Sequence, residues 1–160
     1  MTPEQCVAAL RRANEVARQA VAQGRHPFGA VLIAPDGDTV LMEQGNINTV
    51  NHAEATLIRN AAAQYSADYL WTCTLVTTVE PCAMCAATQY WAHVGRTVYG
   101  MTEERLLSLT GDHDENPTLN LPCRSVFAAG QKAIEVIGPV SQVEAEIAAL
   151  HLDFWSRHPT

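Results

Sequence analysis

Two short segments of this 160-residue chain constrain its fold more than any other feature. The first is His52-Ala53-Glu54, and the second is Pro81-Cys82-Ala83-Met84-Cys85. Each segment opens a predicted helix that follows a predicted strand. Both segments carry side chains that bind metals or move protons, so a fold that brings the two helix starts together would create a reactive site.

The hydrophobic pattern predicts helices and strands in alternation. A capping box of Thr2 with Gln5, and Gly24 as a stop, delimit the first helix. A Pro-Asp-Gly-Asp turn at 35–38 joins the next two strands into a hairpin. We predict helices over residues 2–23, 53–64, 82–91 and 141–155, strands over 28–34, 39–45, 73–78, 96–99 and 133–138, and a polar loop over 111–122.

This order predicts one α/β domain over residues 1–160, with a central sheet of about five strands between layers of helices. The opening hairpin makes the sheet mixed rather than parallel. Ser141 is the predicted N-cap of the last helix, and Glu144 completes its capping box. No change of composition marks a domain boundary.

Composition and charge narrow the class of partner. Hydrophobic residues make up 48% of the chain and charged residues 17%, which is typical of a globular protein. No apolar run is long enough for a transmembrane helix, and the N-terminus has no signal-peptide pattern, so we predict a cytoplasmic protein without a membrane partner. A net charge of -7 argues against nucleic acid and favours a small neutral or cationic substrate.

The five cysteines do not form a disulfide framework. Cys82 and Cys85 make a C-x-x-C pair, whereas Cys6, Cys73 and Cys123 stand alone. We interpret the three isolated cysteines as reduced, small buried hydrophobic residues.

The C-x-x-C pair and the His-x-Glu segment together predict a catalytic zinc site. Cys82 and Cys85 are three residues apart, so on a helix they share a face, and a helix N-terminus favours thiolates. Two thiolates and the imidazole of His52 leave one tetrahedral position open, and Glu54 stands beside it as a proton shuttle. Alone, a C-x-x-C is equally typical of a redox pair or a structural zinc, which would need a fourth ligand. The conceivable fourth ligands are Cys73, Cys123 and His26.

The order H-x-E then P-C-x-x-C is the signature of zinc nucleobase deaminases. The chain resembles the cytidine deaminase-like superfamily, and most closely its branch of bacterial guanine deaminases and tRNA adenosine deaminases. The resemblance implies a three-layer α/β/α fold, bound Zn²⁺ and a homodimer. It rests on residues 27–31, 43–46, 52–54 and 80–85, and on Tyr90-Trp91.

The same resemblance implies a role for each matching residue. The zinc ligands are His52, Cys82 and Cys85, and Glu54 is the proton shuttle. The Asn46 side chain binds the ring or its sugar, while the backbone of Ala53 and of Glu80-Pro81 approaches the reacting edge. Phe28 and Trp91 either wall the pocket or are plain core aromatics.

Three segments could determine which ring is the substrate, and each has more than one interpretation. The loop between Asn46 and His52 is shorter than in the family, so Asn48 is an alternative to Asn46. In guanine deaminases an acidic residue at about the distance of Asp112 or Asp114 past the second cysteine contacts the purine; a solvated loop is the alternative. Phe154-Trp155 either covers a pocket or packs the last helix.

We therefore predict zinc-dependent hydrolytic deamination of a nucleobase-type ring, with guanine or a related purine as the first candidate. The alternatives are a tRNA adenosine deaminase, a cytosine or cytidine deaminase, and a non-catalytic zinc-stabilised interaction module. Glu54 argues against the last, because a structural zinc does not need it.

Overall fold

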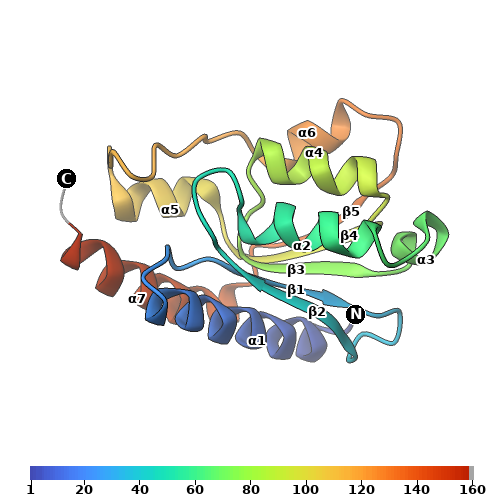
Figure 1. The fold of residues 1–160 in the computed structure, drawn as a ribbon, viewed down its shortest axis with the longest axis horizontal. Coiled ribbons are helices and arrows are strands. Elements are labelled where there is room, and N and C mark those ends of the chain that lie inside the picture. The colour runs from blue at the N-terminus through green and yellow to red at the C-terminus, as the bar shows by residue number, and fades with distance from the viewer. Residues whose placement is uncertain (159–160) are drawn as a thin grey trace.

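A five-stranded mixed sheet forms the centre of the computed structural model, which describes residues 1–158 (Figure 1). The strands lie in the order β2-β1-β3-β4-β5. Strand β1 is antiparallel to both β2 and β3, whereas β3, β4 and β5 are parallel, which confirms the predicted mixed sheet. Their bounds are β1 Gly29–Ile33, β2 Val40–Gly45, β3 Thr74–Val79, β4 Arg96–Met101 and β5 Glu135–Ile137.

Helices cover both faces of the sheet (Figure 1). Helices α1 (Pro3–Ala22) and α7 (Ser141–Arg157) pack on one face, and α2 (Ala53–Ala62) and α4 (Ala83–Ala92) lie on the other. Alternate residues of β1 divide between two apolar clusters: Val31 and Ile33 face α1, and Ala30 and Leu32 face α2. This alternation is the period of a strand buried on both faces. Every helix in the described residues is too short or too polar to span a lipid bilayer.

Three short helices were not predicted: α3 (Ala67–Trp71), α5 (Glu103–Thr110) and α6 (Cys123–Ala128). Such short segments depend on tertiary contacts more than on their own propensity. The predicted capping box at Thr2 is present. The predicted cap of the last helix is wrong, because Val140 is the N-cap of α7 and makes no side-chain cap bond. Ser141 is instead the first residue of that helix.

The topology gathers the ends of four strands at one edge of the sheet. Gly29 at the start of β1 pairs with Gly45 at the end of β2, and Val79 and Met101 pair at the ends of β3 and β4. The residues that leave these strands therefore meet in one place. In chain order they are Phe28, Asn46, Glu80 to Cys82, and Thr102-Glu103.

Candidate zinc site and substrate cavity

The three predicted zinc ligands stand at two helix N-termini. His52 is the N-cap of α2, Cys82 is the N-cap of α4, and Cys85 lies in the first turn of α4. Neither N-cap side chain bonds to its own helix backbone, so the imidazole and the thiol are free to bind a metal. The positive end of a helix dipole also favours a thiolate at Cys82 and Cys85.

The separations of the donor atoms match a zinc site. Nδ1 of His52 lies 3.6 Å from Sγ of Cys82 and 3.6 Å from Sγ of Cys85. Zinc bonds of about 2.1 Å to nitrogen and about 2.3 Å to sulfur, at a tetrahedral angle, put those atoms about 3.6 Å apart. The group therefore has the size that zinc requires.

No fourth protein ligand accompanies this group within residues 1–158. Cys73, Cys123 and His26, the conceivable fourth ligands, all lie outside the group. Cys6, Cys73 and Cys123 are buried and free, as the sequence predicted. Three protein ligands with an open position are the pattern of a catalytic rather than a structural zinc.

The two cysteine thiols differ in pKa. A hydrogen bond from Cys85, and a further one with His52, hold the pKa of the Cys82 thiol well below its usual range. The same hydrogen bond, together with burial, raises the pKa of Cys85. A cation bound between the two sulfurs would favour the thiolate form of both.

Glu54 lies inside this site. Its side chain is buried, and its Oε1 accepts a hydrogen bond of 2.6 Å from the Thr77 hydroxyl on β3. Its Oε2 lies 3.6 Å from Sγ of Cys85. Burial raises the pKa of Glu54, which suits a carboxyl group that must both accept and return a proton.

A cavity of about 490 Å³ opens in front of the ligands. His52, Cys82 and Glu54 line it, together with three residues predicted to bind substrate: Phe28, Asn46 and Asp114. The other lining residues come from the strand ends, from the loop before α2, from α4 and α5, and from the loop before α6: His26, Asn48, Thr49, Val79, Glu80, Met84, Glu103, Leu106, Glu115, Asn116, Pro117, Thr118 and Leu119.

The structure separates the two candidate asparagines. Asn46 is 3% exposed, lines the cavity, and has no side-chain hydrogen bond within the described residues. The Oδ1 atom of Asn48 instead accepts from the backbone amides of Val50 and Asn51, at 3.0 and 2.8 Å. The Oδ1 atom of Asn48 is thus engaged in its turn, whereas neither polar atom of the Asn46 side chain is bonded within the described residues, although both residues line the cavity.

Trp91 is outside the cavity lining and outside the core, so neither of the two places predicted for it, the pocket wall or the core, is correct. The side chain is 75% exposed and packs against Tyr90 and Lys132. Trp91 follows Cys85 by about 1.7 turns of α4, so the two side chains leave the helix in different directions. Asp112 is also outside the cavity lining, as is the buried Ala53 between His52 and Glu54.

Glu80 has a positioning role that the sequence did not suggest. Its Oε1 accepts from the backbone amide of Cys123 at 3.0 Å, and its Oε2 accepts from that of Glu103 at 3.4 Å. One buried carboxylate thus holds the first residues of α6 and α5 against the end of β3. These amides are among those that a helix leaves unpaired at its start.

Glu103 is the cavity residue that sequence reasoning missed. It is the first residue of α5 and is 7% exposed. Burial, with Cys82 as a second cause, raises its pKa to about 8. The sequence signal that could have pointed to Glu103 is Thr102, a typical N-cap residue. Thr102 caps α5 directly after β4, the strand that lies parallel to β3.

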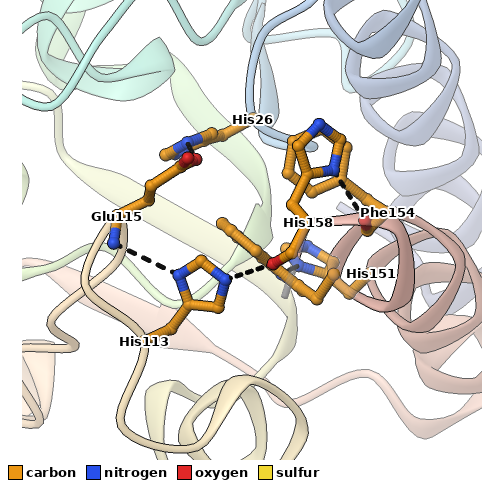
Figure 2. A network of polar contacts seen from close by, with 7 residues as sticks. His26, His113, Glu115, His151, Phe154 and His158 are labelled. Atoms are coloured by element: carbon orange, nitrogen blue, oxygen red, sulfur yellow. Dashed lines mark hydrogen bonds and ion pairs between the residues drawn. The ribbon is translucent and has the colours of Figure 1, made fainter. Parts of the chain in front are cut away.

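The loop before α6 is held to the C-terminal helix by histidines and aromatic rings (Figure 2). Nε2 of His26 lies 3.2 Å from the Glu115 carboxylate, and Nε2 of His113 lies 2.6 Å from the carbonyl of His158. Trp155 packs between the rings of His26 and His113. Phe154 and Trp155 are buried in this cluster and support the wall residue His26, but they do not line the cavity.

The cavity is acidic. Its lining holds the carboxyl groups of Glu54, Glu80, Glu103, Asp114 and Glu115, and no lysine or arginine among residues 1–158. Such a lining offers acceptors to amino and ring N–H groups but no cation for a phosphate.

Comparison with known proteins agrees with this geometry. Residues 3–101 match the model of the cytidine and deoxycytidylate deaminase zinc-binding region. The "Probable cytosine deaminase" of Schizosaccharomyces pombe is 36% identical over 95% of this chain and 93% of its own. The guanine deaminase of Bacillus subtilis is 40% identical over 56% of this chain and 60% of its own, and bacterial tRNA-specific adenosine deaminases also match.

Among solved structures, the guanine deaminase from Nitrosomonas europaea superposes on this chain with a TM-score of 0.71 and 22% identity. The superposition covers 93% of this chain and 84% of the guanine deaminase chain. Another chain of this fold was solved in complex with 8-azaguanine. At these identities the likeness establishes the α/β fold. The family model spans more than half of the chain, and the chain therefore belongs to the family of cytidine and deoxycytidylate deaminases, which are hydrolytic aminohydrolases with a zinc-binding region.

Proposed function

We propose that this protein hydrolyses the exocyclic amino group of an unphosphorylated nucleobase-type ring, with guanine as the first candidate. The observation that carries the proposal is the cavity itself. The buried Glu54 lies beside His52, Cys82 and Cys85 at one end, and acidic groups without any lysine or arginine line the rest.

Zinc held by these three ligands would supply, when bound, a water whose pKa is lowered toward about 7. The buried Glu54 carboxyl group, beside these ligands, is placed to take a proton from a water that adds to the ring carbon bearing the amino group. The Thr77 hydroxyl holds Oε1, so Oε2 is the oxygen turned toward the ligand Cys85. Glu54 then returns the proton to the amine, and the products are the ring carbonyl and ammonia.

The Asn46 amide orients the ring during this transfer. It is buried at the cavity wall, and its side chain has no protein partner among the described residues. A buried amide gains from meeting the carbonyl or N–H groups of a base edge. Phe28, on the adjacent strand end, supplies an apolar surface for the ring.

The charge of the cavity supports a base over a nucleotide or RNA. Phosphate recognition usually relies on arginine, lysine or backbone amides at a helix start. The lining within residues 1–158 has neither basic side chain, and the whole chain carries a net charge of -7. A tRNA or nucleotide substrate would meet repulsion from the exposed carboxylates of Asp114 and Glu115.

One observation favours guanine as the substrate, and another favours cytosine. Asp114 at the cavity mouth offers an acceptor to the amino and N–H edge of guanine. Cytosine is the second candidate, because the relative that matches nearly the whole chain is a "Probable cytosine deaminase".

Ammonia release over a matched panel tests the proposal. The panel is guanine, cytosine, guanosine, cytidine, deoxycytidylate and transfer RNA, with the Glu54→Gln protein as the blank for contaminating enzymes. We expect release from a free base and none from the nucleotide or the RNA. Preferred turnover of either phosphorylated substrate would overturn the proposal while leaving the family assignment intact.

A further inference from the structure

Glu103 is the one buried carboxylate of the cavity whose side chain nothing in the described structure explains. Glu54 is bonded to Thr77, and Glu80 is bonded to two helix amides. Glu115 faces His26. Within residues 1–158 the Glu103 carboxyl group has no hydrogen bond and no ion pair, although more than nine-tenths of the residue is buried.

A carboxyl group in such surroundings is costly to the empty protein. Removing it from water without a partner destabilises its charged form, and the raised pKa of Glu103 reflects this. The thiol of Cys82 and the carboxylates of Glu54 and Glu80 are close enough to add to the effect. Nothing in the packing of α5 requires the charge, since Leu106 on the same helix supplies its core contact.

The placement of Glu103 is nevertheless specific. The Thr102 cap and the Glu80 carboxylate both bond to backbone amides in the first turn of α5. The parallel pairing of β3 with β4 sets that turn beside the strand end that carries Cys82. The carboxyl group is thus held in the cavity wall, next to the zinc ligands, by a rigid frame.

We propose that Glu103 is a substrate-recognition residue whose carboxyl group takes a ring N–H or amino donor of the base. The inference rests on the proposed function and narrows its substrate class to amino-heterocycles that keep a free N–H donor besides the reacting amino group. In the complex, the donor takes the place of cavity water at a carboxyl group that has no protein partner within the described residues. A charge-assisted hydrogen bond of this kind is among the strongest available to a neutral ring.

The test pairs Glu103→Gln with Glu104→Gln. Glu104 is the next residue of the same helix and is exposed, so it controls for the loss of one acidic group. Both variants and the wild type are assayed on the preferred base, and on the same base methylated at each ring N–H in turn. Thermal unfolding of each protein is measured without substrate.

For Glu103→Gln we expect kcat/KM on the parent base to fall at least tenfold. Methylation at one ring position should harm the wild type but have much less effect on this variant, which identifies the contacted N–H. The melting temperature should stay close to that of the wild type, because the Glu103 carboxyl group has no hydrogen bond or ion pair to lose within the described residues. Glu104→Gln should match the wild type in every measurement.

A structural role would instead lower the melting temperature and leave the response to methylation unchanged, and that result overturns the proposal. So does full activity of Glu103→Gln on a base that the wild type deaminates; in that case the proposed function stands. If the wild type deaminates no base in the panel, the proposed function fails, and this inference fails with it.

Discussion

The two ends of the cavity are built in different ways. At the zinc end, His52, Cys82 and Cys85 sit at the starts of two helices on a buried sheet. At the opposite end, Asp114 and Glu115 are exposed residues of a loop held to the molecule by His26 and by helix α7. Regular elements thus place the candidate metal ligands and Glu54, and a loop places the acidic groups of the rest of the cavity wall.

This difference explains why the reaction is easier to assign than the substrate. The hydrolytic step needs a fixed geometry, which regular structure provides. Loops accept changes of length and side chain at little energetic cost, so a family can alter its ring preference there. Glu103 lies between the two, on the first turn of a helix but within the wall that meets the ring.

The largest expected effect is at the zinc end. Removing metal with a chelator should abolish ammonia release, and added zinc should restore it, because the three protein ligands leave the fourth position for water. Metal analysis should find one zinc per chain. Activity that survives complete metal removal would contradict the catalytic zinc site.

Next in size is the loss of the proton shuttle. Glu54→Gln should lower kcat by about 10²- to 10⁴-fold while zinc content and melting temperature hold. Thr77→Val, which removes the hydrogen bond to Oε1 of Glu54, should also lower kcat, but by a smaller factor. Turnover by Glu54→Gln within a few-fold of the wild type would mean that another group moves the proton.

At the loop end, Trp155→Ala should lower the free energy of unfolding by about 3–5 kcal/mol, because a buried aromatic ring is lost. KM should rise as well, since Trp155 supports His26 and His113. Urea unfolding and steady-state kinetics measure the two effects. Leu152→Ala is the matched control, because Leu152 lies on the same helix and is 51% exposed; equal losses in the two variants would argue against the cluster.

The loop end should also be the more sensitive to acid. Burial, with a smaller contribution from His26, lowers the pKa of His151 to about 3, well below the value of about 6.5 in an unfolded chain. The unfolded state alone binds a proton between these values, so stability is lost as the pH falls from about 6.5 toward 3. The slope should be on the order of 1 kcal/mol per pH unit. Unfolding free energies below pH 6.5 should fall less steeply for His151→Gln, and equal slopes would refute this origin.

The smallest effect separates two neighbouring acids. Asp114→Asn should lower kcat/KM for guanine by up to about tenfold, because the group lines the cavity but is exposed to water. Asp112→Asn should change nothing, since Asp112 lies outside the lining. Comparing guanine with cytosine in both variants shows whether Asp114 selects the ring. If neither variant changes the preference between guanine and cytosine, another residue of the cavity must recognise guanine.

The sequence alone determined the parts of this protein that depend on neighbours along the chain. The capping box at Thr2 predicted the start of the first helix, and the opening hairpin with the alternation of strands and helices predicted the layered mixed sheet. The segments around His52 and Cys82 predicted the metal-binding group, because two helix starts already hold its donors at fixed spacing. Local hydrogen bonds and local periodicity are enough to specify such features.

Only the tertiary structure decided which side chains share the cavity. Asn46 and Asn48 look alike in the sequence, but one turn consumes the second. Trp91 looked like a pocket residue and lies on the outer face of its helix. The Thr102 cap marks the start of a helix at Glu103, but the place of Glu103 in the cavity wall follows from the parallel pairing of β3 with β4 and from the bond that Glu80 makes to the first turn of α5. A sequence pattern records the face of one helix or strand, whereas the contact between two strand ends is set by the sheet that brings them together.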